Sequence, residues 1–176
     1  MEPTGGVVRP TVVTMNALRP VPSRDPAAFE ALYAAAYRPT VFLAFATTQS
    51  VEAAEEIAQE AFLQLYRNWD RVTDHRAWLR RAVMSLSTSW VRRAVRARTV
   101  GTTLMPDQVG PDISAEVWST LAKLPPRQRA AIVLRYVEDL SERDIAAVLK
   151  CRPGTVKSML SRARVVLRKE LSDDQD

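Results

Sequence analysis

The side chains best suited to a chemical task lie near the C-terminus, on two segments of helical pattern separated by a three-residue break. One side of the second segment carries hydroxyls, lysines and arginines, which bind base edges and phosphates. The opposite side carries apolar residues three and four positions apart, as a buried helix face requires. The polar side consists of Thr155, Lys157, Ser158, Ser161, Arg162, Arg168 and Lys169, and the apolar side of Val156, Met159, Leu160, Ala163, Val166 and Leu167. The pattern predicts a helix-turn-helix that binds DNA; a solvated basic helix in a bundle is the alternative.

The first helix of this pair has a clear start and an unusual end. Ser141 is a suitable N-cap, and Asp144 three residues later makes an acidic variant of the capping box. Pro153 suits the first turn of the second helix, where a missing N–H costs nothing. The break, Lys150–Arg152, contains no glycine, and Lys150 stands where a left-handed residue is favoured.

A second basic helix is predicted from Arg76 to Arg98. Its apolar stripe is accompanied by a stripe of aromatic, hydroxyl and guanidinium groups, and no acid occurs between His75 and Pro106. That stripe consists of Trp78, Arg81, Ser85, Thr88, Arg92 and Arg96. Such a surface fits DNA, with Trp78 placed to stack on an unpaired base. The alternative is a solvated face, with Trp78 as part of the core.

An acidic helix is predicted from a cap at Ser50 to about Trp69. Its outer arc consists of Glu52, Glu55, Glu56, Gln59, Glu60, Leu63, Tyr66 and Arg67. Leu63 and Tyr66 lie among carboxylates, and an apolar pair inside a polar rim indicates a protein interface. Scattered apolar residues are also common on ordinary surfaces, so both interpretations stay open.

These helices fit an all-α protein of two small helical domains joined by a flexible linker, because no alternating strand pattern is present. The chain has 176 residues. We expect a flexible N-terminal arm over residues 1–24, a first domain over 25–98 and a linker over 99–113. The helix-turn-helix domain then spans 114–171, and an acidic tail spans 172–176.

Composition argues against several functional classes. One cysteine, Cys151, and one histidine, His75, cannot build a zinc site or an internal disulfide. No nucleophile elbow, Walker loop or metal cluster is present, so we expect no enzyme activity, no cofactor and no small-molecule substrate. No signal peptide or membrane span is expected either, which favours a cytoplasmic protein. The net charge of +5 fits a polyanionic partner.

Three stretches resemble the extracytoplasmic-function (ECF) branch of the sigma-70 family. The stretch EEIAQEAFLQLYRNWDRV (Glu55–Val72) resembles its core-polymerase-binding helix, and RAWLRRAVMSLSTSWVRR (Arg76–Arg93) its −10-reading segment. The region from Leu124 to Leu171 closely resembles its −35-reading domain, and the Arg-rich middle is most similar to actinobacterial members. The resemblance implies an initiation factor that binds core RNA polymerase, through its beta and beta-prime subunits, and promoter DNA. It also allows an anti-sigma partner.

The resemblance also implies residue roles. Core polymerase would contact Glu55, Glu56, Gln59, Glu60, Leu63 and Tyr66. The −10 element would be contacted by Asp74, His75, Arg76, Trp78, Arg81, Ser85, Thr88 and Arg92. The −35 element and its phosphates would be contacted by Arg127, Arg129, Arg152, Gly154, Thr155, Lys157, Ser158, Ser161 and Arg162.

The sequence departs from the family pattern at three positions: Ser85 replaces a frequent asparagine, and Lys150 and Arg152 replace a frequent glycine and serine.

Three other classes of protein compete with this interpretation. A helix-turn-helix activator would bind duplex DNA alone. An enzyme is a second alternative, but the chain has no recognisable spacing of catalytic residues. The basic helix could instead bind a membrane surface.

Overall fold

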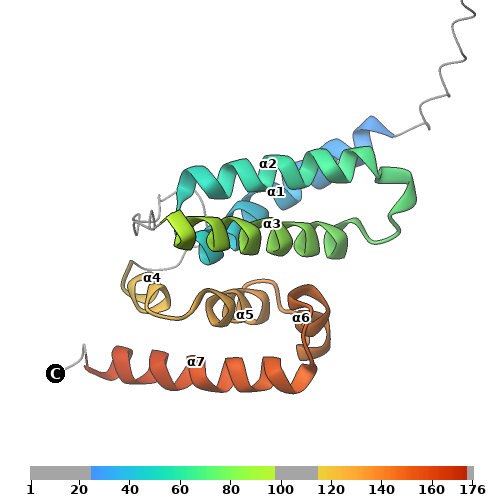
Figure 1. The fold of residues 1–176 in the computed structure, drawn as a ribbon. Coiled ribbons are helices and arrows are strands. Elements are labelled where there is room, and N and C mark those ends of the chain that lie inside the picture. The colour runs from blue at the N-terminus through green and yellow to red at the C-terminus, as the bar shows by residue number, and fades with distance from the viewer. Residues whose placement is uncertain (1–24, 98–114, 174–176) are drawn as a thin grey trace, which may run out of the picture.

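The computed structural model describes residues 25–97 and 115–173, and within them it has seven α-helices, one 3-10 turn and no strand (Figure 1). The predicted all-α fold is therefore confirmed. The helices are α1 (Pro26–Thr48), α2 (Val51–Arg67), α3 (His75–Ala97), α4 (Ala115–Ala122), α5 (Pro126–Tyr136), α6 (Glu142–Leu149) and α7 (Pro153–Asp173), with the 3-10 turn η1 at Trp69–Arg71. The predicted arm and linker lie outside the described residues, and α7 ends two residues beyond the predicted Leu171.

Helices α1, α2 and α3 form the N-terminal lobe. Asp25 caps α1 by accepting a hydrogen bond from the Ala27 amide, and Ser50 caps α2 by accepting one from Ala53, which confirms the predicted cap at Ser50. Gln49 ends α1 in the left-handed conformation, so that α2 returns antiparallel to α1. The apolar arc of α2, with Ala54, Ile57, Ala58, Ala61, Phe62 and Leu65, is buried against the other two helices.

Helices α4 to α7 form the C-terminal lobe. Helix α5 lies between the N-terminal lobe and α7, which runs along the far side of the molecule (Figure 1). The Ser141 side chain accepts a hydrogen bond from the Asp144 amide at 3.1 Å and donates one to the Asp144 carboxylate at 2.6 Å. The predicted N-cap at Ser141 is thus confirmed and sets the start of α6, while Asp144 bonds the Ser141 hydroxyl rather than the Ser141 amide of a complete capping box.

The two lobes share one hydrophobic core. Every residue of α1 from Thr40 to Thr48 is buried, because this half of the helix lies between its own lobe and α5. Trp118 of α4 stacks on Phe45 with 4.9 Å between ring centroids and lies 5.8 Å from Phe42. The sequence predicted two modules connected by a linker, whereas the structure packs them directly against each other.

Arg129 lies at the centre of this contact and is only 1% exposed. Its Nε donates to the Ala46 carbonyl in the last turn of α1. Its Nη1 donates to the carbonyls of Ala122 at 2.8 Å and Leu124 at 3.1 Å, where α4 ends. Helix C-termini leave carbonyls without partners and carry partial negative charge, so one cation satisfies one helix end from each lobe. Burial lowers the pKa of Arg129 to about 10, so the side chain stays charged at neutral pH.

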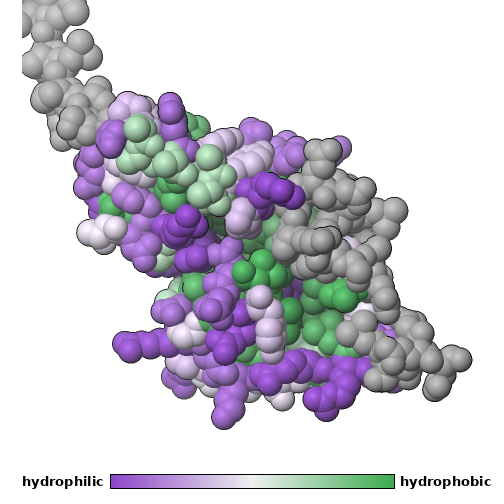
Figure 2. All heavy atoms as spheres, turned by 180° about the vertical axis from the view of Figure 1, so that it is seen from behind, coloured by the Kyte–Doolittle hydropathy of each residue, from purple (hydrophilic) through white to green (hydrophobic). Residues whose placement is uncertain are grey.

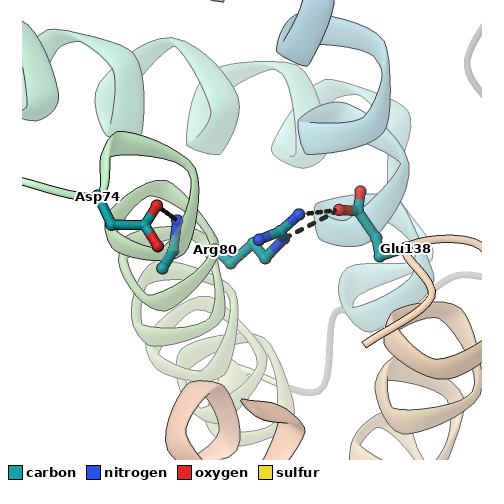
Figure 3. Close-up of polar contacts among 4 residues, drawn as sticks. Asp74, Arg80 and Glu138 are labelled. Atoms are coloured by element: carbon teal, nitrogen blue, oxygen red, sulfur yellow. Dashed lines mark hydrogen bonds and ion pairs between the residues drawn. The ribbon is translucent and has the colours of Figure 1, made fainter. Parts of the chain in front are cut away.

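A half-buried ion pair closes a second point of contact between the lobes. Nε and Nη2 of Arg80 on α3 lie 2.9 and 2.7 Å from Oε2 of Glu138, in the loop after α5 (Figure 3). The two side chains are 20% and 14% exposed, which reduces solvent screening of the pair.

We expect Arg129→Met to lower the free energy of unfolding by about 3 kcal/mol, because the buried carbonyls of two helix ends lose their donor. Urea denaturation followed by tryptophan fluorescence measures the change. The control is Arg143→Ala, at an exposed position on α6, which should stay within about 0.5 kcal/mol of the unmodified protein. Equal stability of the two variants would contradict a structural role for Arg129.

Candidate functional site

The helix-turn-helix consists of α6, the break Lys150–Arg152 and α7. Lys150 adopts a φ of 50°, and the amides of Lys150 and Cys151 both donate to the Ala146 carbonyl. The first bond is that of an αL cap and the second is the 6→1 bond of a Schellman motif. Such a left-handed helix end normally favours glycine, and here a lysine forms it at a modest conformational cost. Arg127 supports the same helix end, since its Nη2 donates to the Leu149 carbonyl at 2.6 Å.

The outer face of α7 presents the residues predicted to read the −35 element. Val156, Met159, Leu160 and Ala163 are buried, which turns the polar side of the helix outward. That side consists of Thr155, Lys157, Ser158, Ser161 and Arg162, all exposed, with Arg152 and Gly154 exposed just before them. The Ser158 hydroxyl donates its hydrogen to the Gly154 carbonyl at 3.0 Å. Its oxygen can still accept a hydrogen bond from a ligand.

Arg129 corrects the sequence-based interpretation. It was predicted to lie near the phosphate backbone, together with Arg127. In the structure its guanidinium is buried and donates to main-chain carbonyls, so it does not reach a phosphate in this arrangement. Arg127 is exposed. The sequence shows two equivalent arginines two positions apart, and only the tertiary packing distinguishes them.

The acid-free face of α3 borders the C-terminal lobe. Ser85 and Arg92 are exposed, whereas Trp78, Arg81 and Thr88 are half-buried. Thr88 donates to the Met84 carbonyl at 2.6 Å. Arg80, on the same helix, is engaged with Glu138 instead.

The loop before α3 is held by two of the predicted −10 residues. The Asp74 carboxylate accepts from the Ala77 amide at 2.9 Å and caps the start of α3 (Figure 3). The His75 ring stacks on Trp69 with 3.8 Å between centroids, and its Nε2 lies 3.1 Å from the Trp69 carbonyl. Arg76 is exposed beside them. These contacts give the short loop a defined shape at the head of the basic helix.

Parts of the two predicted DNA surfaces face each other. A cavity of about 290 Å³ between the lobes is lined by Ser85, Thr88 and Arg92 from α3 and by Arg127 and Lys150 from the C-terminal lobe. A neighbouring cavity of about 390 Å³ also involves Ser85 and Lys150, and adds Trp78 and Arg81. The structure therefore brings residues from the two predicted DNA surfaces together, while the outer face of α7 lies on another side.

The outer arc of α2 forms part of a wider apolar surface. Leu63 and Tyr66 are 43% and 39% exposed and, with Phe29 and Tyr33 of α1, line a groove of about 340 Å³. Phe29 packs edge-on against Tyr66 at 4.9 Å between centroids. The contribution of α1 was not predicted, although its aromatic residues at four-residue spacing were an available signal.

Carboxylates of α2 lie on the same outer arc as Leu63 and Tyr66. Glu55, Glu56 and Gln59 are exposed, and Glu60 is half-buried, accepting a hydrogen bond from Gln64 at 2.7 Å. Burial raises the pKa of Tyr37, and the nearby Tyr33 and Glu55 add to the effect. An apolar centre inside a charged rim is typical of a protein interface.

A second apolar groove, of about 310 Å³, lies in the C-terminal lobe between α4, α5 and α7. It is lined by Val117, Leu121, Ile132, Val133, Tyr136, Val137, Arg164 and Leu167. Figure 2, which views the molecule from behind, shows apolar side chains gathered on this lobe.

Residues 25–97 and 115–173 bring together no group of three His, Cys, Asp or Glu side chains that could hold a metal ion. No helix in the described parts of the chain combines the length and the apolar character that a membrane crossing demands.

Comparison with known proteins places both lobes in one family. Residues 32–97 match the model of sigma-70 region 2, and residues 114–167 match that of sigma-70 region 4. The chain is 36% identical over 127 residues to the RNA polymerase sigma-E factor of Streptomyces avermitilis, covering 67% of this chain and 70% of that protein. It is also 36% identical over 146 residues to the ECF RNA polymerase sigma factor SigW of Bacillus subtilis, covering 70% and 78%.

Solved structures share the fold. The Bartonella quintana sigma factor RpoE, crystallised with the anti-sigma factor NepR, is 24% identical, with a TM-score of 0.70 over 82% of this chain and 97% of that one. CnrH, in complex with the cytosolic domain of CnrY, is 27% identical, with a TM-score of 0.61 over 84% and 90%. The sequence matches in both lobes show that the chain belongs to the sigma-70 family as an extracytoplasmic-function RNA polymerase sigma factor.

Proposed function

We propose that this sigma factor directs core RNA polymerase to its promoters through three separate surfaces and catalyses no reaction itself. The observation that carries the proposal is the separation of charge among helices. Helix α2 exposes carboxylates, α3 contains no acidic residue, and α7 contains none before Glu170. One acidic and two basic surfaces fit one protein partner and two DNA elements.

The polymerase surface is the acidic side of α2 together with its aromatic groove. Its residues are Glu55, Glu56, Gln59, Glu60, Leu63 and Tyr66, and they would face the beta-prime subunit, with the beta subunit contacting other parts of the chain. The exposed pair Leu63 and Tyr66, backed by Phe29, supports this assignment, because apolar anchors inside a charged rim supply most of the affinity of such interfaces.

The promoter surfaces lie on α3 and α7. For the −10 element we propose Asp74, His75, Arg76, Trp78, Arg81, Ser85, Thr88 and Arg92. For the −35 element we propose Arg127, Arg152, Gly154, Thr155, Lys157, Ser158, Ser161 and Arg162. The domain limits 25–98 and 114–171 are supported by the two family matches. A helix with hydroxyls in its first turns and arginines beyond suits entry into a major groove.

An anti-sigma factor is a further proposed partner. The related structures are complexes of RpoE with NepR and of CnrH with the cytosolic domain of CnrY. In this chain the two apolar grooves offer surfaces on which such a partner could dock. A factor that works on RNA polymerase would act in the cytoplasm.

The proposed function is tested by transcription from genomic DNA with core RNA polymerase, followed by sequencing of the transcripts. We expect promoter-specific transcripts that require both the core enzyme and this protein. If the protein bound specific duplex sites alone and produced no such transcripts, a helix-turn-helix activator would be the better description.

Glu56→Lys combined with Leu63→Ala should weaken binding to core polymerase by tenfold or more, on the order of 1–3 kcal/mol, because it reverses a rim charge and removes an apolar anchor. Fluorescence anisotropy with labelled sigma factor measures the affinity. The matched control is Glu30→Lys, at an exposed position of the same lobe. Equal affinity of the double variant and the control would remove this surface from the interface.

Arg152→Ala should lower the salt dependence of promoter binding by about one unit of log–log slope if this exposed side chain contacts a phosphate. Holoenzyme affinity for a promoter fragment is measured across a series of salt concentrations. The control is Arg164→Ala, another exposed arginine of α7, which lines the apolar groove instead of the predicted DNA-reading face. An unchanged slope for Arg152→Ala would exclude the contact.

A further inference from the structure

The cavity between the lobes has an unusual lining. On one side α3 contributes the hydroxyls of Ser85, Thr88 and Ser89 and the guanidinium of Arg92. On the other side the C-terminal lobe contributes Arg127 and Lys150, and no carboxylate lines the cavity. Two separate parts of the chain thus contribute cations and hydroxyls to the lining of one partly open cleft.

The cations of this cavity are not neutralised by the described protein. In residues 25–97 and 115–173 neither Arg92 nor Lys150 forms an ion pair, and Glu138 on the loop after α5 is engaged by Arg80. Arg127 uses one Nη2 hydrogen bond on the Leu149 carbonyl, which leaves its other donors available. Like charges held around a common space repel one another unless an anion lies between them.

The size of the cavity restricts the anion. A volume of about 290 Å³ lies at the lower end of the range of small-molecule sites, about 300–1,000 Å³. It is too small for a DNA duplex or a helix of a partner. The Thr88 hydroxyl already donates to the Met84 carbonyl, which leaves the hydroxyls of Ser85 and Ser89 as donors. These hydroxyls and the cations suit a compact anion with several charged oxygens, which accepts hydrogen bonds from both kinds of group.

We propose that the cleft between the lobes binds a small oligophosphate, held by Arg92 from one lobe and by Arg127 and Lys150 from the other. The neighbouring cavity, which shares Ser85 and Lys150 and contains Trp78, has room for a nucleoside attached to the phosphates. The ligand class is therefore a free oligophosphate or the phosphate chain of a nucleotide.

Binding at this place has a consequence for transcription that rests on the proposed function. Ser85, Thr88, Arg92 and Arg127 are also proposed promoter contacts. An anion that touches both lobes stabilises the closed arrangement by the free energy of its binding. It would thus compete with promoter DNA for the same side chains and hold the initiation factor closed.

The test uses the full chain without polymerase, and isothermal titration calorimetry with sodium tripolyphosphate, ATP and an eight-nucleotide oligo-dT as three separate probes. We expect one tripolyphosphate per chain. Arg92→Ala and Lys150→Ala should each weaken binding about tenfold, because each removes a charge-assisted contact. The matched controls, Arg93→Ala and Lys169→Ala, remove exposed cations of α3 and α7 that do not line the cavity and should leave the affinity unchanged.

The outcomes separate the possible sources of phosphate. Tighter binding of ATP than of tripolyphosphate, lost in the same two variants, would identify a nucleotide as the ligand. Equal weakening by all four substitutions, or several anions per chain, would show non-specific charge attraction and overturn the proposal. If the Arg92→Ala and Lys150→Ala variants weakened the binding of oligo-dT alone, the proposal would also be overturned, because the cleft would then be only a DNA surface.

Transcription with core polymerase distinguishes this proposal from the proposed function. We expect promoter-specific transcripts without the anion, and fewer of them when tripolyphosphate is added to the sigma factor before the core enzyme. Normal transcripts with no anion binding would overturn the cleft proposal and leave the initiation role intact. Anion binding without promoter-specific transcripts would overturn the initiation role and leave the cleft proposal intact.

Discussion

The closed arrangement of this sigma factor, in which the two lobes pack against each other, depends on one buried cation, Arg129. Arg129 donates hydrogen bonds to carbonyls at the ends of α1 and α4, so a single guanidinium satisfies helix ends that belong to different lobes. Charge and geometry act together, because both helix ends carry partial negative charge and both lack main-chain donors. The aromatic packing of Trp118 on Phe45 fills the space around this centre.

This contact determines which surfaces are available. With the lobes packed through α1 and α5, the basic side of α3 borders a narrow cleft whose other wall is the end of α6. The outer face of α7 and the acidic side of α2 lie elsewhere and stay exposed. The three proposed contact surfaces are therefore not equally accessible in one arrangement. The pair of Arg80 and Glu138, with both side chains largely buried, adds a second polar contact that separation of the lobes would break.

Local structure follows closely from local sequence in this chain. The caps at Ser50 and Ser141 form as predicted, because a side-chain oxygen next to a helix start satisfies an amide within three residues. The glycine-free turn also forms, with Lys150 in the left-handed conformation. The core of the apolar face of α7, Val156, Met159, Leu160 and Ala163, is buried as predicted for a similar reason: helical periodicity decides which side chains share a face.

The sequence by itself determined the helices, their caps, the two lobes and the family, because each of these depends on neighbouring residues or on a contiguous motif. The tertiary structure alone decided which arginine is structural. Arg127 and Arg129 have the same chemistry, yet one is exposed and the other is buried and donates to the Ala46 carbonyl, 83 residues away in the chain. It also decided that Phe29 and Tyr33 join Leu63 and Tyr66 in one groove, and that Arg92 faces Lys150 across a cavity. Such relations depend on packing between distant helices, which no local pattern encodes.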